Sequence, residues 1–269
     1  MDAQQIISDS FPPREIAHRV EDLGVAKSKT GAWTILILAI LAGAFISLGS
    51  IFYIFAMTGS SMGFGITRII GGLCFSLGLI LVIIAGAELF TGNNLIAMAW
   101  ASGKIKSRDV FRNWILSYTG NVIGCLITVL LVYLADLASF AQDEVRQTAF
   151  KLADAKVYLT PTTAFFRAVL CNALVCLAVW LTLGGRTAID KILSIIFPVT
   201  AFVVLGLEHS IANWFFLPYA LVCGGNFPIG SVLSNLLFVT LGNMVGGTVL
   251  VASVYWMAYL RPNVSKTNN

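Results

Sequence analysis

The chain has 269 residues, of which 58% are hydrophobic and only 11% are charged. Soluble domains carry about 25% charged residues, so this composition excludes an ordinary soluble protein and indicates a chain with several membrane-spanning helices. The formal net charge of +4 is small and forms no basic stripe interleaved with aromatic residues, which argues against a nucleic-acid partner. All five cysteines lie in apolar stretches, a pattern that predicts neither a disulfide framework nor a metal site.

Residues 1–30 are predicted to form a separate cytoplasmic segment that contains a short amphipathic helix on the membrane surface. Pro12 and Pro13 open this helix. Its apolar face is predicted to consist of Ile16, Ala17, Val20 and Leu23. Its polar face is predicted to consist of Arg14, Glu15, Arg19 and Glu21.

Residues 31–261 are predicted to form one transmembrane domain with six spans, followed by a cytoplasmic tail at 262–269. The six apolar runs cover residues 33–57, 69–101, 114–135, 164–183, 192–222 and 236–260. The longest hydrophilic stretch, 136–163, has mixed charge and no evident apolar periodicity, so we expect it to be a loop and not a second domain.

The second and fifth runs are too long for one span, and a polar cluster interrupts each. The clusters begin at Glu88 and Glu208. Both runs are therefore predicted to be broken helices. Twelve lysines and arginines fall on the side of the N-terminus and five on the other side. The positive-inside rule then predicts that both termini are cytoplasmic.

The two polar clusters share a sequence pattern, GxExxxxN, at an offset of 120 residues. The helices after them repeat four further positions at an offset of 122. The matched pairs are Gly86 with Gly206, Glu88 with Glu208, Asn93 with Asn213, Asn113 with Asn235, Gly120 with Gly242, Asn121 with Asn243, and Gly124 with Gly246. Three spans per repeat require the second repeat to be inverted, with its broken helix meeting the first near the bilayer centre. The glycine pairs of the following helices are predicted to allow close helix packing.

Freed backbone groups and carboxylates are costly at membrane depth unless they line a cavity or meet partners, so the breaks are predicted to form a functional site. The positive N-terminal ends of the half-helices favour a nearby anion. His209 is the only histidine in the apolar region, which excludes a histidine-rich metal site and leaves it as a proton donor or a fixed hydrogen-bond donor, with Thr91 able to orient it. Glu88 and Glu208 are predicted to cap freed N–H groups of their own breaks.

Several strings, among them AELFTG from Ala87 and GLEHSIAN from Gly206, resemble the formate/nitrite transporter family over nearly the full chain. The resemblance implies a homopentamer of aquaporin-like protomers in the inner membrane of a prokaryote, each with its own pore for a small monovalent anion and without a cofactor. It implies that Thr91 and His209 form the pore centre and that Leu79, Leu89, Phe90 and Phe202 form constrictions, to which the sequence adds Phe75. It also implies pore or vestibule roles for Asn172, Lys156 and Glu208, and it places Lys27 near a family lysine. The repeated pattern itself predicts that Glu88, Asn93 and Asn213 support the breaks.

The resemblance leaves the substrate open, with formate ahead of nitrite and hydrosulfide. If the anion is the base of a weak acid, His209 is predicted to protonate or polarise it transiently, so that it crosses the apolar constrictions. For each of the three phenylalanines, simple core packing is an equal alternative. An intramembrane enzyme is disfavoured because no nucleophile or metal set is evident, and a neutral-solute pore is disfavoured because paired NPA motifs are absent.

Overall fold

A computed structural model describes residues 10–261, and within that range every element of regular secondary structure is a helix. The predicted tail at 262–269 and the first nine residues of the N-terminal segment lie outside the described residues. The α-helices are α1 (Pro13–Lys29), α2 (Ala32–Met57), α3 (Gly63–Ile84), α4 (Phe90–Asn93), α5 (Ala97–Ala101), α6 (Ser107–Leu134), α7 (Glu144–Val157), α8 (Pro161–Gly184), α9 (Ala188–Val204), α10 (Ser210–Val222), α11 (Ile229–Val245) and α12 (Val254–Tyr259). Short 3-10 turns, η1 (Asn94–Ile96) and η2 (Leu137–Ser139), and a π-helix, η3 (Gly246–Ser253), complete the set.

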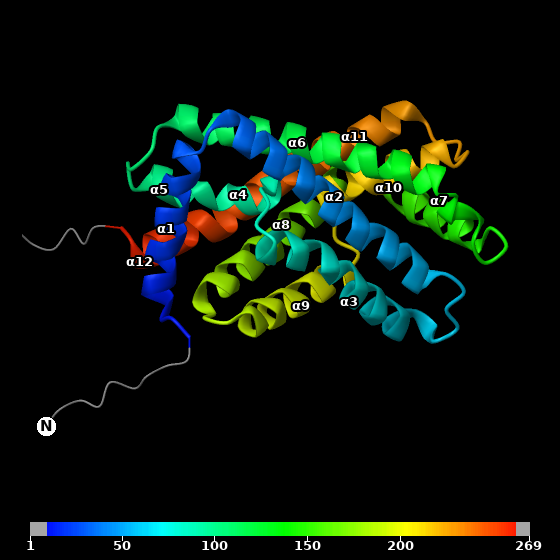
Figure 1. The fold of residues 1–269 in the computed structure, drawn as a ribbon, viewed down its shortest axis with the longest axis horizontal. Helices are drawn as coiled ribbons and strands as arrows, with labels where there is room; N and C mark the ends of the chain where they lie inside the picture. Colours follow the sequence, from blue (N-terminus) through cyan, green and yellow to red (C-terminus); the bar gives the residue numbers. More distant parts are fainter. Residues whose placement is uncertain (1–9, 262–269) are drawn as a thin grey trace, which may run out of the picture.

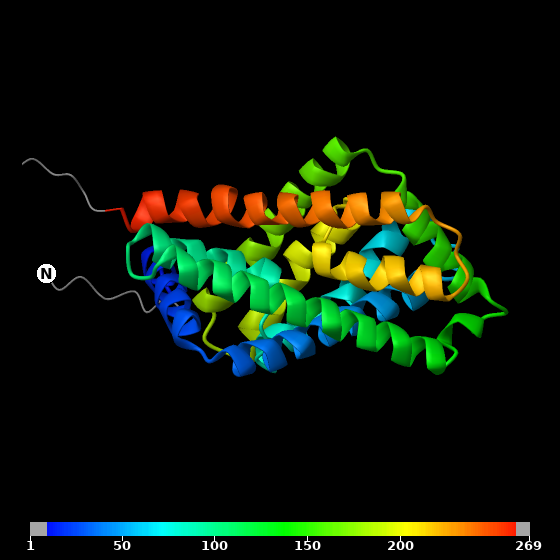
Figure 2. The ribbon, with the colours of Figure 1, turned by 90° about the horizontal axis from the view of Figure 1, so that it is seen from above.

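Helix α6 and the continuous rod formed by α11, η3 and α12 run along the long axis of the molecule, and α8 crosses at an angle to them (Figures 1 and 2). Five helical stretches of residues 10–261 are long and apolar enough to cross a membrane. The remaining predicted span, 192–222, is divided between the shorter helices α9 and α10. The molecule is therefore a polytopic helical membrane protein by the length and composition of its helices.

Both predicted helix breaks are confirmed. Helix α3 ends at Ile84 and the chain becomes helical again at Phe90, and helix α9 ends at Val204 and helix α10 begins at Ser210. Gly86 and Gly206 lie in these breaks with φ of 80° and 66°, a left-handed conformation that other residues adopt at a cost. The matched glycines are therefore explained by the turn that each break requires.

Matched glycines in α6 and in the α11–η3 helix lie where two helices touch, as predicted. A Cβ atom on Gly124 would collide with the carbonyl oxygen of Ile40 in α2, and one on Gly246 would collide with that of Val169 in α8. Helix backbones this close are typical of small residues at membrane helix interfaces.

We expect Gly124→Ala and Gly246→Ala to lower the free energy of unfolding by about 1–3 kcal/mol, because the added methyl group forces two backbones apart. Thermal unfolding of the purified protein in detergent would measure the change. Gly230→Ala is the matched control, since Gly230 is also helical and a Cβ atom added to it would have no neighbour within 4 Å. Equal unfolding temperatures for all three variants would contradict the prediction.

The predicted N-terminal helix is present as α1, but one residue of its expected polar face is buried. Ile16, Ala17 and Val20 pack inward as expected, and Leu23 is 37% exposed. Glu21, expected on the polar face, is only 3% exposed and pairs with Lys104 of the α5–α6 connection. Burial alone would raise the pKa of Glu21, but hydrogen bonds with Lys104 and Ser102, together with the nearby charge of Lys104, outweigh burial and hold the pKa below its ordinary value. Glu21 therefore anchors α1 to the domain.

The expectation of a loop at 136–163 is wrong, because this stretch contains helix α7. Its buried side chains, Val145, Ala149, Ala153 and Val157, recur every fourth residue. Two of the four are alanines, whose small apolar surface makes the periodicity weak in the sequence. Helix α7 packs against α10 and supplies Lys156 to the site described next.

Candidate functional site

Asparagine side chains hold both helix breaks through equivalent hydrogen bonds. Asn121 accepts the Phe90 N–H at 2.9 Å and donates to the carbonyl oxygens of Ala39 and Glu88 at 2.8 and 2.9 Å. Asn243 accepts the Ser210 N–H at 2.8 Å and donates to the carbonyl oxygens of Ala168 and Glu208 at 2.8 and 3.0 Å. Each side chain is fully buried. Each asparagine thus pairs one N–H and one carbonyl of its break from the following helix of the same half.

The prediction that Glu88 and Glu208 cap their own breaks is therefore wrong. Both carboxylate oxygens of Glu88 accept hydrogen bonds from the Lys27 ammonium, at 2.7 and 2.6 Å, and one of them also accepts from the Asn93 amide at 2.7 Å. Glu208 receives Lys156 at 3.0 Å and the Asn213 amide at 2.6 Å. A carboxylate buried this deeply needs a cation and hydrogen-bond donors, and these contacts supply both.

The two asparagine partners are held in the same way in both halves. The Asn93 amide also donates to Asn113 at 2.9 Å, and the Asn213 amide donates to Asn235 at 2.8 Å. The two lysines come from α1 and α7, which lie at opposite ends of the long axis in both views (Figures 1 and 2). The matched residues of the repeat therefore make matched contacts.

Thr91 and His209 meet where the two breaks approach each other. The Thr91 hydroxyl oxygen lies 3.0 Å from His209 Nε2. The Ala212 backbone N–H donates to His209 Nδ1 at 3.1 Å, so Nδ1 is an acceptor. In a neutral imidazole the proton then resides on Nε2 and points at the Thr91 hydroxyl. Thr91 is fully buried and His209 is 4% exposed. His209 lines the first of the two cavities described next, and Leu89 and Gly92, which lie beside Thr91 in the sequence, line the second.

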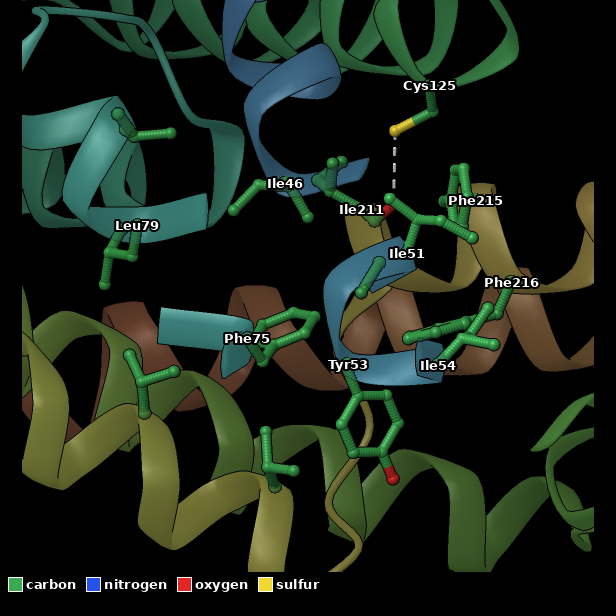
Figure 3. Packing of buried hydrophobic residues seen from close by; sticks show 14 of the residues in the cluster. Ile46, Ile51, Tyr53, Ile54, Phe75, Leu79, Cys125, Ile211, Phe215 and Phe216 are labelled. Atoms are coloured by element: carbon green, nitrogen blue, oxygen red, sulfur yellow. Dashed lines mark hydrogen bonds between the residues drawn. The ribbon is translucent and has the colours of Figure 1, made fainter. Parts of the chain in front are cut away.

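The first cavity, here the His209 cavity, lies on the α7 side and has a volume of about 90 Å³. It contains Phe75, Phe202, His209, Lys156, Glu208 and Asn213 among its lining residues. The rings of Phe75 and Phe202 are 5.6 Å apart, and Phe202 stacks on His209 at 6.1 Å. Phe75 also meets Tyr53, which in turn meets Phe216, in the packed region of Figure 3. The structure thus brings two of the three predicted phenylalanines together beside the histidine.

The second cavity, here the Leu89 cavity, lies on the α1 side and has a volume of about 70 Å³. Its lining includes Leu79, Leu89, Asn93 and Lys27, so α1 forms part of its wall. At the repeat offset of 120, Leu89 corresponds to His209 and Thr91 to Ile211. At these two equivalent positions, the first break therefore carries Leu89 and Thr91, and the second carries His209 and Ile211. Each break has one polar and one apolar side chain there, in opposite order.

Phe90, Glu88 and Asn172 line neither of the two cavities. Phe90 packs edge-on against Tyr118 at 5.0 Å, within the core. Asn172 is fully buried, and its amide donates to the carbonyl oxygens of Thr91 at 3.2 Å and of Asn243 at 2.7 Å. In the structure Asn172 thus ties the Thr91 break to the helix that holds the other break. Glu88 reaches the Leu89 cavity through its bonds to Lys27 and Asn93, which both line it.

Two charged residues of the His209 cavity were not predicted as site residues. Arg68 of α3 and Arg167 of α8 line it, although in the sequence they contributed only to the topology count. Their sequence neighbourhoods carry no motif, and only folding brings them together. Within residues 10–261, no group of three or more histidine, cysteine, aspartate or glutamate side chains is placed to hold a metal ion.

The fold and the site define a helical membrane protein in which two interrupted helices meet at a threonine–histidine pair between two cavities. A model of the formate/nitrite transporter family matches residues 14–257, and the chain belongs to this family. The formate channel FocA of Escherichia coli K12 is 39% identical, over 95% of this chain and 96% of FocA. The FocA of Haemophilus influenzae is 33% identical, over 92% and 94% of the two chains.

Solved structures extend the similarity to the fold. A pentameric formate channel with formate bound is 39% identical, with a TM-score of 0.79, over 86% of this chain and 98% of that chain. An FNT family ion channel is 27% identical, with a TM-score of 0.84, over 91% of this chain and 98% of that chain. The resemblance found in the sequence is thereby confirmed.

Proposed function

We propose that this protein is a channel for small monovalent weak-acid anions, with formate as its substrate. The observation that carries this function is the buried Thr91–His209 hydrogen bond, placed between two cavities on opposite sides. The similarity to formate channels at up to 39% identity over most of the chain supports formate as the anion. Transport, rather than an enzymatic reaction, fits a family of transporters.

The proposed path runs from the His209 cavity, past Phe75 and Phe202, across the Thr91–His209 pair, and past Leu79 and Leu89 into the Leu89 cavity. A bare anion is costly in the apolar part of such a path, whereas a fixed cation at its centre would hold the anion too tightly for rapid passage. A neutral imidazole N–H and a hydroxyl offer hydrogen bonds without a permanent charge. Phe90 is assigned core packing instead of a constriction, because it packs on Tyr118.

We propose that His209 acts by polarising the anion. Formation of an imidazolium needs a proton on Nδ1, and that proton would face the Ala212 N–H, which already donates to this atom. The contact therefore favours the neutral ring with its Nε2–H directed at the path. A proton that crosses together with the anion then enters from one of the two cavities and is not donated by His209.

The assembly and orientation follow from the same reasoning. We propose a homopentamer, as in the solved pentameric formate channel, with each protomer carrying its own path. We propose two inverted three-span repeats, supported by the matched hydrogen bonds and by the location of α1 and α7 at opposite ends. We propose that both termini lie in the cytoplasm of a prokaryote and that the chain lies in the inner membrane, in keeping with the lysine and arginine count.

Uptake into proteoliposomes tests the function. We expect saturable formate uptake that rises when the pH is lowered on the side of addition, because a proton accompanies the anion. Nitrite and hydrosulfide are assayed beside formate at two pH values, since the family description includes nitrite. Faster uptake of nitrite or hydrosulfide would replace formate as the substrate, and no uptake of any of the three would contradict the channel itself.

A further inference from the structure

The His209 cavity carries more positive charge than its contacts neutralise. Three cationic side chains line it, Lys156, Arg68 and Arg167, against one carboxylate, Glu208. The Glu208 carboxylate is bonded to Lys156 at 3.0 Å. The charges of the two arginines therefore remain without a counter-charge among the residues that line this cavity.

Arg68 and Arg167 converge on the turn that follows helix α9. Arg68 Nη1 donates to the carbonyl oxygen of Val203 at 3.1 Å, and Arg167 Nη1 approaches that of Gly206 at 3.5 Å. Among residues 10–261, neither guanidinium has a carboxylate within 4.0 Å. A guanidinium has five N–H donors, so each side chain keeps donors for an anion at the cavity mouth.

The Leu89 cavity lacks this feature. Its only cationic lining residue in the described chain is Lys27, and both oxygens of Glu88 bond to that ammonium. One cavity thus offers two guanidiniums without carboxylate partners, whereas the other offers a neutralised ion pair. The two ends of the proposed path differ in the electrostatic potential that an arriving anion meets.

We propose that Arg68 and Arg167 form an entry site for monovalent anions at the mouth of the His209 cavity, so that the protein captures anions more readily from this side than from the α1 side. The inference rests on the proposed channel function and adds a recruiting site to it. Arg167 is exposed and Arg68 is half-buried, so water and salt screen both charges. The site therefore concentrates anions without trapping them, as conduction requires.

The test uses the double variant Arg68→Gln with Arg167→Gln, since glutamine removes the charge but keeps an amide N–H donor. The protein is reconstituted in one orientation, which is verified by the accessibility of a tag at the C-terminus. For formate added on the α7 side at low ionic strength, we expect the half-saturating concentration to rise about tenfold, with the maximal rate within about twofold of the parent protein. In 0.5 M salt we expect the difference to shrink below about threefold.

Arg146→Gln provides the matched control. Arg146 lies on α7, at the same end of the molecule, but pairs with Asp143 and does not line the cavity. We expect its half-saturating concentration to equal that of the parent protein, and we expect the double variant to behave normally when formate is added on the α1 side.

An unchanged half-saturating concentration in the double variant would overturn the entry site. An equal rise on both sides, or an equal rise in Arg146→Gln, would also overturn it, since both would indicate a general surface-charge effect. Failure of the proposed function is distinguishable, because the parent protein itself would then conduct none of the anions tested.

Discussion

Replacing His209 with phenylalanine is expected to lower formate flux at least about 100-fold while the assembled protein remains intact. Phenylalanine fills a similar volume and retains stacking on Phe202, but it removes the N–H donor at the point where the path is most enclosed. Loss of one preorganised donor to a desolvated anion raises the barrier by about 3 kcal/mol, which corresponds to this factor. Proteoliposome uptake measures the flux, and size-exclusion chromatography measures the assembly.

His209→Gln distinguishes polarisation from protonation by the histidine. Glutamine can donate a hydrogen bond but cannot shuttle a proton near neutral pH, so we expect this variant to retain a measurable part of the flux that the phenylalanine variant loses. Flux as low as in His209→Phe would contradict polarisation and favour protonation. His18→Phe is the matched control, because the His18 side chain is 56% exposed on α1, outside both cavities, and should leave flux unchanged.

The breaks were predictable from the sequence because an apolar span tolerates a carboxylate or a freed backbone group only at special points. Glu88 and Glu208 mark those points, and the repeat at an offset of 120 relates them. The contact between Thr91 and His209 was expected from the family resemblance together with the ability of a hydroxyl to orient an imidazole. In the structure the Thr91 hydroxyl oxygen and His209 Nε2 are 3.0 Å apart.

The partners of the buried carboxylates were not predictable, because they are remote in the chain. Lys27 is 61 residues from Glu88, and Lys156 is 52 residues from Glu208. Because the sequence does not reveal these lysine partners, capping of a backbone N–H was the simplest role to predict for a carboxylate at a break. Folding gives that capping to asparagines instead, since a side chain that both accepts and donates can satisfy an N–H and two carbonyls together.

The burial of Glu21 and the existence of α7 were missed for a related reason. Both depend on a surface supplied by another part of the fold. Lys104, which neutralises Glu21, is 83 residues away. The alanines of α7 become buried because α10, α2 and α11 pack against that helix. The periodicity of apolar residues in the sequence reveals the buried face of a helix only when the residues of that face are strongly apolar.

Truncating either capping asparagine is expected to lower the free energy of unfolding by about 3–5 kcal/mol. Asn121→Ala leaves the Phe90 N–H and the carbonyls of Ala39 and Glu88 without these hydrogen bonds, and Asn243→Ala does the same at the other break. The N–H and the carbonyl of each break would be left unpaired, at about 1–3 kcal/mol each, whereas the carbonyls of Ala39 and Ala168 keep their places in helices α2 and α8. Thermal unfolding in detergent and formate uptake would be measured together.

Thr128→Ala is the matched control on the same helix as Asn121. Thr128 is also buried, but its hydroxyl bonds only to the carbonyl of Gly124 one turn earlier, and that carbonyl keeps its place in the helix. We expect this variant to unfold within about 1 kcal/mol of the parent protein. If the two breaks are equivalent parts of a repeat, Asn121→Ala and Asn243→Ala should cost similar free energies. A loss in only one of them would show that the matched hydrogen bonds differ in strength, and a loss no larger than that of Thr128→Ala would show that the asparagines do not hold the breaks.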